Sequence, residues 1–433
     1  MAEIKEALED FNSWWKEEFG INFKDREIYK QIQKFMNLPQ IIALTGLRRA
    51  GKTTLMLKII EDAIKNGFES RNIIYFSFDE FREVEIRKVM HEYEELMEKN
   101  FRKEKYILLF DEIQKLNNWE DQLKVIYDAL GKNIKMIISG SESLFIKRKS
   151  KETLAGRIFE FKVEPLSFRE FLSFKEIDFK PIGIYKRELL NLFYEFTLTL
   201  GFPELVGVKE KEVIGKYIKE GVLEKVIFRD MQKLFNIKDI SLIESLLNIF
   251  IEDPGQIVEV SELAKELKIS RQTLSNYLMY LEESFLIKKL YNFSKNRRKV
   301  ERKLKKYYPA IVSVNLLFKE DDLSKSKIFE WLIVSQLKAE FFWRDPYKNE
   351  IDIVLADKEP LPIEIKYGKI ETKGILAFMK KFNVNEGYII SKDKEETLKI
   401  NSKIISVIPA FKFLLSQNRD GIFDKDWKDP RNK

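Results

Sequence analysis

A loop bounded by two glycines and followed by Lys and Thr is the first feature of this sequence with a chemistry of its own. Gly46 and Gly51 enclose four residues, and Lys52 and Thr53 follow directly. This is the spacing of a phosphate-binding loop, whose glycines let backbone N–H groups curl around phosphate oxygens. In such loops the lysine contacts the β- and γ-phosphates, and the hydroxyl ligates Mg²⁺. The predicted nucleotide-binding residues are Gly46, Leu47, Arg48, Arg49, Ala50, Gly51, Lys52, Thr53 and Thr54.

The sequence on either side of this loop also suits a nucleotide site. Residues 41–44 form an apolar run of strand length, and residues 54–63 have helical character. A helix N-terminus would therefore face the phosphates. The alternative is a plain glycine-containing turn, but strand, loop, Lys-Thr pair and helix all occur in the right order. No Asn-Lys-x-Asp string for guanine recognition is present, which favours ATP over GTP. The side chains of Arg48 and Arg49 are expected in solvent or in salt bridges.

A second apolar run ends in two carboxylates. Residues 106–110 are continuously apolar, as in a strand buried within a parallel sheet, and Asp111 and Glu112 follow. Ligands collect at the carboxyl ends of such strands. Asp111 is expected to hold the magnesium through water, and Glu112 to polarise the attacking water as general base. Together with the loop, these carboxylates predict ATP hydrolysis.

Serine and arginine residues are further candidates for this site. Ser141, or less readily Ser139, follows the apolar run 136–138 and could sense the γ-phosphate; an ordinary strand-end turn is an equal alternative. Arg157 is the candidate arginine finger, with Arg148 a second one. The alternative for both is a surface arginine in solvent. Whether Arg157 would act in its own chain or on a neighbouring copy stays open.

Residues 258–289 have the pattern of a helix-turn-helix. Ser261 and Ser270 are plausible N-caps of two helices, and Leu274, Leu278 and Leu281 recur at helical spacing. These leucines are expected in the core. The exposed leading turns of the second helix would carry the residues that face DNA. They are Arg271, Gln272, Thr273 and Asn276.

A strongly basic run follows the strand-like segment 285–290. It contains Lys295, Arg297, Arg298, Lys299, Arg302, Lys303, Lys305 and Lys306, with Glu301 as its single acid. A basic hairpin after a helix-turn-helix is the arrangement of a winged helix, whose wing can lie along DNA phosphates. A solvated loop or a protein-contact module are the alternatives. The coincidence of helix and basic run favours DNA as the partner.

Carboxylates and a lysine gather again near the C-terminus. Glu364 and Lys366 are two residues apart on one expected strand, so their side chains project from the same face. Asp352 on a neighbouring strand and Glu330 on the preceding helix could join them. Carboxylates around one point can form a Mg²⁺ site for phosphodiester cleavage, with the lysine stabilising charge. A half-exposed strand with alternating charge is the alternative.

Short apolar runs alternate with charged helical stretches through the first part of the chain. Strands at 41–44, 73–78, 106–110 and 136–138 separated by helices predict a parallel, doubly wound α/β sheet. Residues up to about Leu38 are expected to form an amphipathic helix. The predicted domains are 1–165, an N-terminal helix plus phosphate-loop core; 166–245, a helical lid; 246–310, the winged helix; and 311–433, an α/β nuclease-like domain.

Composition bounds the class of protein. The 433 residues include 77 Lys and Arg against 70 Asp and Glu, no cysteine and one histidine, His91. Disulfides, thiolate metal sites and multi-histidine centres are therefore excluded. No apolar run approaches the ~18 residues of a membrane helix, and the N-terminus lacks the apolar stretch of a signal peptide. We expect a cytoplasmic protein without a membrane partner. The high Lys and Glu content is typical of hyperthermophile proteins.

Eight short segments of the sequence together resemble a widespread archaeal and bacterial family of AAA-type ATPases. The segments are Gly46–Leu55, Asp111–Trp119, Leu154–Arg157, Pro165–Phe171, Gly201–Glu204, Thr273–Leu290, Glu350–Asp352 and Glu364–Lys366. The resemblance implies a phosphate-loop core followed by a helical lid, a winged helix and a PD-(D/E)xK nuclease-like domain. It also implies ATP hydrolysis and a link to DNA. Gln114 and Trp119 carry over as signature positions, of which only Trp119 has an evident structural role. The long basic wing is a departure that need not be shared.

Three functions remain open from the sequence. The first is an ATP-driven DNA-binding protein with a metal-dependent nuclease. The second is a nucleotide-controlled switch whose nuclease-like domain is inactive. The third is a protein-remodelling ATPase in which the winged helix is an assembly module. All three require ATP and Mg²⁺, and in each the chain could also bind a second copy of itself.

Overall fold

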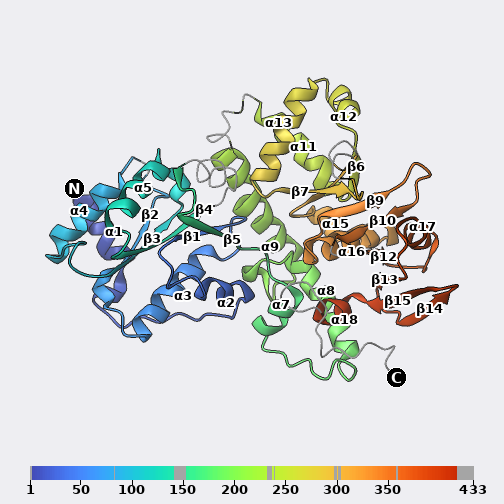
Figure 1. The fold of residues 1–433 in the computed structure, drawn as a ribbon, viewed down its shortest axis with the longest axis horizontal. Helices are drawn as coiled ribbons and strands as arrows, with labels where there is room; N and C mark the ends of the chain where they lie inside the picture. The colour runs from blue at the N-terminus through green and yellow to red at the C-terminus, as the bar shows by residue number, and fades with distance from the viewer. Residues whose placement is uncertain are drawn as a thin grey trace. The chain divides into compact units, whose positions relative to one another are not determined.

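The computed structural model describes residues 2–81, 83–140, 153–231, 237, 239–296, 300, 304–356 and 359–416. The chain divides into two compact units, residues 1–165 and residues 166–433. Figure 1 traces the first unit in blue to green and the second from green to red. Each unit has its own sheets and is described by itself.

The first unit contains a five-stranded parallel sheet. Its strands are β1 (Ile41–Thr45), β2 (Ile73–Ser77), β3 (Tyr106–Asp111), β4 (Ile134–Gly140) and β5 (Ile158–Lys162). They lie in the order β2-β3-β4-β1-β5, and every neighbouring pair is parallel. The central strands are buried along their length, which explains why each is a continuous apolar run. The predicted α/β fold with a parallel sheet is confirmed.

Helices connect and cover these strands. They are α1 (Ala2–Phe11), η1 (Ser13–Trp15), α2 (Glu27–Gln33), α3 (Lys52–Lys65), η2 (Ser70–Asn72), α4 (Ile86–Met97), η3 (Ile113–Lys115) and α5 (Trp119–Leu130). The helix α1 packs on β2 and on α4, and α4 packs on α5. Their apolar sides and the strands share one hydrophobic core.

The prediction of one helix up to about Leu38 is wrong, because α1 ends at Phe11 and α2 begins only at Glu27. Asn12 lies beside the edge strand β2: its Nδ2 donates to Tyr75 O (2.9 Å), and Tyr75 N donates to its Oδ1 (2.7 Å). The indole nitrogens of Trp14 and Trp15 both donate to Ile73 O. The segment leaves the helical conformation because its side chains satisfy backbone groups of a strand edge.

Helices come first in the second unit. They are α7 (Phe168–Phe174), α8 (Lys186–Thr199), η4 (Pro203–Leu205), α9 (Lys211–Lys216), the π-helical stretches η5 (Tyr217–Leu223) and η6 (Lys225–Met231), and α11 (Ile240–Glu252). Ser167 begins α7 with a capping box, since its hydroxyl accepts from Glu170 N and the Glu170 carboxylate accepts from Ser167 N.

Two five-stranded sheets follow in this unit. The first has the order β10 (Glu350–Ile351), β9 (Phe341–Arg344), β7 (Ile287–Asn292), β8 (Lys305–Pro309), β6 (Gln256–Val258). The second has the order β11 (Ile353–Ala356), β12 (Pro360–Lys366), β13 (Glu386–Ser391), β15 (Lys403–Pro409), β14 (Glu396–Ile400). The expected strand around residues 351–355 is interrupted at Asp352, and its two parts pair in different sheets.

Helices pack against these two sheets. They are α12 (Val260–Glu266), α13 (Arg271–Glu283), α15 (Val314–Leu317), α16 (Asp322–Gln336), α17 (Lys373–Phe382) and α18 (Ala410–Ser416). The helix α13 contacts β7, whereas α16 and α17 contact β12. Strand β9 pairs with β7. One sheet therefore contains strands from before and after residue 310, the predicted boundary between the winged helix and the nuclease-like domain.

Candidate functional site

The loop of residues 46–51 has a backbone that only glycine allows at two positions. Gly46 has φ 141°, and a Cβ there would lie 2.3 Å from Val163 O. Gly51 has φ 98° and is the N-cap of α3. A side chain at Gly46 would force the loop away from the end of β5, so both glycines are needed for the close turn between β1 and α3.

Lys52 lies over this loop rather than in solvent. Its side chain is buried, and Nζ donates to Gly46 O (3.0 Å) and to Leu47 O (3.2 Å). These carbonyls hold the ammonium against the loop at the N-terminus of α3. A positive charge and a helix N-terminus thus occupy the same place, which favours a bound anion.

Asp111 is the centre of the site's hydrogen bonds. Its Oδ2 accepts from Thr53 Oγ1 (2.7 Å) and from the Tyr75 hydroxyl (2.8 Å). Its Oδ1 accepts from Ser139 Oγ and from Glu112 N (3.0 Å). The carboxylate is 4% exposed. Side chains from β2, β3, β4 and α3 therefore meet at the carboxyl edge of the parallel sheet, as expected for a ligand site.

Glu112 follows Asp111 in a left-handed backbone conformation with φ 52°. Its backbone N–H also lies 3.2 Å from Ser139 Oγ, and its Oε2 accepts from Gln114 Nε2 (2.6 Å). Burial raises the pKa of the Glu112 carboxyl, and the negative charge of Asp111 adds to this, while Lys52 opposes it. A carboxylate whose pKa is raised is a stronger general base than an ordinary one.

Two residues of the site, Tyr75 and Arg26, were missed from the sequence, and Gln114 was named without a role. Tyr75 reaches Asp111 from the neighbouring strand. Gln114 had a signature position without a role, and it holds Glu112. Arg26 donates from NH1 to Ala50 O (2.9 Å) and from NH2 to Glu164 O (2.6 Å), and it is 5% exposed. No local pattern marks Tyr75 or Arg26, because each reaches the site from a distant part of the chain.

Replacing Tyr75 by Phe should weaken the hold on Asp111 without disturbing the core. Loss of this hydroxyl removes one of the donors to a buried carboxylate, at a cost of about 1–2 kcal/mol. We expect the Mg²⁺ concentration for half-maximal ATP turnover to rise about 3- to 10-fold, because Asp111 is less well positioned. Tyr29→Phe is the matched control, since that hydroxyl donates to Asp62 (2.7 Å), away from the loop. An equal shift in both variants would show a purely structural effect.

Arg157 does not face the loop of its own chain. Its backbone precedes β5, and its O accepts from Ile41 N at the beginning of β1. The loop follows the other end of β1, about 13 Å away for four residues of strand. The Arg157 side chain pairs with Asp128 (2.9 Å). In this structure the Arg157 side chain therefore does not reach the loop of its own chain, and its role as an arginine finger stays a prediction.

The structure describes only some of the remaining candidates of this site. Arg48 NH2 lies 3.9 Å from Asp79 Oδ2, in agreement with the expected salt bridge. Ser139 binds Asp111. Ser141 and Arg148 lie outside the described residues, so their predicted roles stay predictions.

The helix α13 contains the four residues predicted to face DNA, and this role stays a prediction. Arg271 and Gln272 are exposed, and Thr273 and Asn276 are half-buried. Ser270 Oγ accepts from Thr273 N (3.0 Å), which caps the helix. Leu274, Leu278 and Leu281 of the same helix are buried, so the exposed turn is held by a packed face.

The basic run after β7 has only part of its length within the described residues. Lys295 is exposed. Arg297, Arg298, Lys299, Arg302 and Lys303 lie outside the described residues. Lys305 is half-buried, and its Nζ donates to Val300 O (2.8 Å). The inclusion of Lys306 in the DNA-facing wing is wrong: it is 4% exposed, because neighbouring carboxylates hold its ammonium inside the protein.

The C-terminal carboxylates surround this lysine. Lys306 Nζ lies 2.9 Å from Glu330 Oε1, 2.9 Å from Glu350 Oε1 and 3.5 Å from Asp352 Oδ1. Tyr308, two residues along β8, donates its hydroxyl to Glu330. Lys306, Glu350 and Tyr308 were not predicted for this cluster.

The predicted strand pair lies next to this group. Asp352 Oδ2 accepts from Ile365 N (2.8 Å), between Glu364 and Lys366. Those two side chains form an ion pair of 2.7 Å, which agrees with the prediction that both project from the same face. Within the described residues no group of three or more carboxylate or histidine side chains has the arrangement of a metal site. The predicted Mg²⁺ site of Glu330, Asp352 and Glu364 with Lys366 stays a prediction.

Glu364 should make the second unit less stable at high pH. Burial, with the negative charge of Asp352, raises its pKa from 4.5 to about 8. Because the folded-state pKa lies above the unfolded one, this stabilisation is complete below about pH 4.5 and is lost as the pH rises to about 8. We expect Glu364→Gln to remove on the order of 1–3 kcal/mol of the fall in unfolding free energy between pH 5 and 9.

Chemical denaturation at several pH values measures this fall. Glu195→Gln is the control, because Lys175 holds the pKa of that carboxyl below its usual value despite partial burial. Its replacement should therefore leave the slope between pH 5 and 9 unchanged. A Glu364→Gln variant with the parental slope would contradict the raised pKa.

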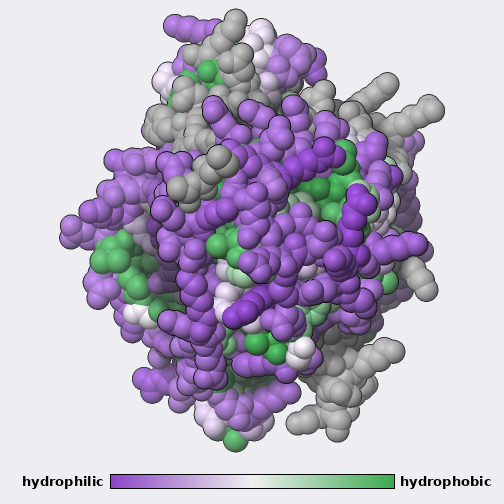
Figure 2. Space-filling view, turned by 90° about the vertical axis from the view of Figure 1, so that its left-hand side faces the viewer, coloured by the Kyte–Doolittle hydropathy of each residue, from purple (hydrophilic) through white to green (hydrophobic). Residues whose placement is uncertain are grey.

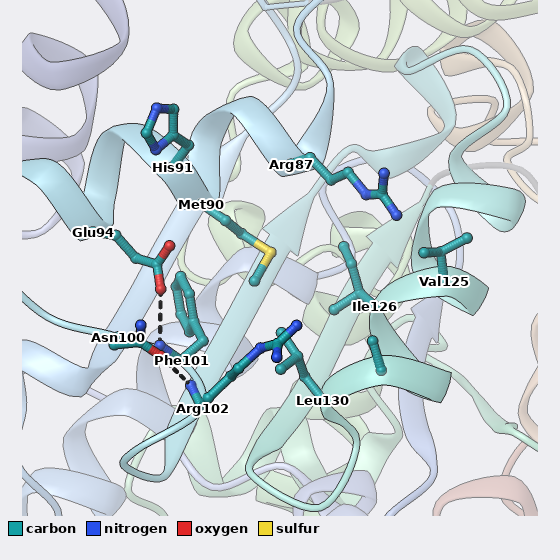
Figure 3. Close-up of a pocket in the computed structure, with 11 residues that line it drawn as sticks. Arg87, Met90, His91, Glu94, Asn100, Phe101, Arg102, Val125, Ile126 and Leu130 are labelled. Carbon is teal, nitrogen blue, oxygen red and sulfur yellow. Dashed lines mark hydrogen bonds between the residues drawn. The ribbon is translucent and has the colours of Figure 1, made fainter.

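A separate cavity of about 270 Å³ lies between α4 and α5. Figure 3 shows Met90 of α4 pointing toward Ile126 and Leu130 of α5, with Arg87 at the margin. None of the predicted site residues lines it.

Figure 2 shows one face of the molecule, on which hydrophilic side chains predominate and hydrophobic ones form separate small patches. No helix among the described residues is long and apolar enough to cross a membrane.

Comparison with protein families divides the chain into three matched segments. Residues 38–172 match an AAA domain. Residues 190–312 match a domain of unknown function, DUF8612, and residues 326–413 match another, DUF4143. The chain therefore contains an AAA-type phosphate-loop ATPase domain, and this domain includes the loop, Asp111 and Glu112.

Similar full-length proteins are uncharacterized. One from Methanocaldococcus jannaschii is 29% identical over 91% of this chain and 92% of its own length. A second from the same organism is 28% identical over 92% of this chain and 89% of its own. A Haemophilus influenzae protein is 28% identical, and the match covers 61% of this chain and 66% of that protein.

Solved structures show weaker similarity. The Saccharomyces cerevisiae Hsp104–ADP complex has a TM-score of 0.32 and 14% identity, covering 77% of this chain and 45% of that chain. AMPPCP-bound DnaA from Aquifex aeolicus has a TM-score of 0.29 and 17% identity, and the match covers 61% of this chain and 90% of the DnaA chain. At such TM-scores neither supports a conclusion about this chain.

Proposed function

We propose that this protein hydrolyses ATP with Mg²⁺ at the loop of residues 46–53. The observation that carries the proposal is the contact of 2.7 Å between Thr53 Oγ1 and Asp111 Oδ2, directly beside Glu112. A hydroxyl and a carboxylate at the end of a phosphate loop are the oxygen ligands that Mg²⁺ prefers. When bound, the metal neutralises the charge that develops on the phosphates.

The protein's own residues have separate roles in this reaction. Lys52 and the loop amides bind the phosphate oxygens, and Asp111 and Thr53 hold the metal. Glu112 orients a water molecule and takes its proton as the oxygen attacks the γ-phosphorus. The bond from this phosphorus to the β–γ bridging oxygen breaks, and ADP and phosphate leave. Gln114, which binds Glu112, orients that carboxylate.

For the second unit we propose DNA as the partner. The supporting observation is that α13 exposes Arg271 and Gln272 while its other face is packed. Residues 246–310 also carry 13 Lys or Arg against 8 Asp or Glu. Positive charge next to an exposed helix is the footprint of a nucleic-acid surface. A protein partner for the same surface is the remaining hypothesis.

The central position of Lys306 favours a regulatory role of the carboxylate cluster over DNA cleavage. A buried ammonium already neutralises Glu330 and Glu350 in the closest positions. We therefore favour a nucleotide-controlled DNA-binding protein with a non-cleaving nuclease-like domain. Mg²⁺-dependent cleavage that is lost in Asp352→Asn would instead support the nuclease hypothesis.

One experiment separates these functions. ATP turnover is measured without DNA and with single-stranded, duplex and branched DNA, and the same samples are scored for cleavage. We expect turnover, DNA affinity that depends on the bound nucleotide, and intact DNA. Absence of turnover under all conditions would overturn the ATPase proposal. Capture of a protein client without DNA affinity would favour a remodelling ATPase.

Two double variants locate the DNA surface. Arg271→Ala with Lys295→Ala removes two positive charges from the proposed surface. Lys186→Ala with Arg187→Ala removes two exposed charges from the beginning of α8. The first should lower the salt dependence of log K by up to about 2 units of slope, and the second should not. Equal behaviour of the two pairs would exclude this surface.

A further inference from the structure

The ammonium of Lys306 lies where oxygen atoms from three elements converge. Glu330 belongs to α16, Glu350 to β10, and Asp352 to the break between β10 and β11. Their oxygens lie 2.9, 2.9 and 3.5 Å from Nζ. Carboxylate oxygens are also the ligands that divalent metals take, but here the cation that they surround is a lysine ammonium.

Two further cationic side chains lie beside this group. Arg344 approaches Glu350 at 3.5 Å, and Lys366 pairs with Glu364 at 2.7 Å. The region thus contains four carboxyl groups and three cationic side chains. Glu364 is 7% exposed, and its Oε2 has no hydrogen-bond partner among the described residues. A buried carboxylate oxygen without a partner is costly, which indicates that the cluster can accept another cation or proton.

Asp352 connects the strand of Glu364 to this group. Its Oδ1 lies 3.5 Å from Lys306 Nζ, and its Oδ2 accepts from Ile365 N (2.8 Å), the residue that follows Glu364 on β12.

The strand β8 explains why a lysine is in this position. Lys306 and Tyr308 are two residues apart on β8, so both side chains point to the same face, and both contact Glu330. Strand β8 thereby inserts the ammonium among the carboxylates, where it pairs with Glu330 and Glu350.

We infer that Lys306 takes the place of a divalent cation in a carboxylate site formed by Glu330, Glu350, Asp352 and Glu364, and that this lysine keeps the site closed to Mg²⁺ and Mn²⁺. The site lies in the second unit and does not depend on the proposed ATPase function. Removing the lysine's charge should open it, because a cation among uncompensated carboxylates gains more than one beside an ammonium.

Mn²⁺ binding to the full-length, nucleotide-free protein tests the inference. Titration calorimetry and the electron paramagnetic resonance of free Mn²⁺ would be used on the parent and on Lys306→Met. We expect the variant to gain one Mn²⁺ site per chain, with a Kd at least about tenfold below any binding in the parent. Mn²⁺ should also raise the melting temperature of the variant. ATP turnover should be unchanged, because Lys306 is not part of that site.

Two controls make the result specific. Lys306→Met/Asp352→Asn should lose the new site. Lys289→Met removes a different half-buried lysine, on β7, the strand next to β8. This lysine pairs with Glu282 of α13 (2.8 Å), and the variant should gain no site. A folded Lys306→Met variant without added Mn²⁺ binding would overturn the inference, and so would equally tight binding by the parent.

Loss of Lys306 leaves buried carboxylates without their cation, which destabilises the fold and can prevent folding. If Lys306→Met does not fold without metal, Lys306→Met/Glu350→Gln serves for the same measurement. That variant has one negative charge fewer and retains Glu330, Asp352 and Glu364. The same Mn²⁺ site is expected, and its absence in the folded double variant would overturn the inference.

Discussion

Replacing Lys52 by Met should abolish ATP turnover while the fold remains intact. The Lys52 ammonium is buried against the loop by the carbonyls of Gly46 and Leu47, and a phosphate group would give it a stronger partner than these neutral acceptors. Removing a preorganised group that stabilises developing negative charge lowers turnover about 10²- to 10³-fold. We also expect weaker ATP binding, because the ground state loses the same contact.

A phosphate-release assay and a nucleotide-binding titration measure the two effects. The matched control is Lys65→Met, at the other end of α3, where the ammonium pairs with Glu61 (2.9 Å). This variant should retain parental turnover. Thermal unfolding of both variants shows whether the fold is intact. Full turnover in a folded Lys52→Met protein would remove the loop from the proposed mechanism.

Replacing Glu112 by Gln should separate ATP binding from hydrolysis. The amide has nearly the same shape and can still contact Gln114, but it cannot accept the proton of the attacking water. Loss of a general base lowers the rate about 10²- to 10⁴-fold. ATP affinity should change little, because the loop, Thr53 and Asp111 are retained.

The expected signature is a protein that retains bound ATP and does not turn it over. Equilibrium binding and single-turnover hydrolysis are the required measurements. Asp121→Asn is the control, since this exposed carboxylate lies nine residues further along the chain, in the first turn of α5. Loss of ATP affinity together with hydrolysis would show that Glu112 serves the structure of the site rather than the proton transfer.

The sequence predicted the nucleotide loop well, because every part of it is local. The glycine spacing, Lys52 and Thr53 lie within eight residues, and their backbone conformations follow from residue type. Asp111 and Glu112 were predicted for a related reason: a strand buried on both faces is a continuous apolar run, and its carboxyl end is where ligands gather. For Glu364 and Lys366, a two-residue spacing was enough to predict that both side chains lie on one face of the strand, where they form an ion pair.

Other residues could not be assigned from the sequence. Arg157 looked like a catalytic arginine, but parallel pairing of β1 and β5 places it at the opposite edge of the sheet from its own loop. Tyr75 belongs to an ordinary apolar strand, and only the pairing of β2 with β3 brings its hydroxyl to Asp111. In each case strand order, which no local pattern contains, decided the position.

Lys306 shows the same limit most clearly. By itself the sequence determined that a basic run follows the helix-turn-helix pattern and that carboxylates occur near residues 330–364. Only the tertiary structure decided that one lysine of that run belongs to the carboxylates. Strand β8 turns Lys306 inward, and α16 and β10 bring Glu330 and Glu350 to it from 24 and 44 residues away. The sequence around a charged residue does not show whether that residue will be buried or which charges will face it, because both are set by the chain segments that fold around it.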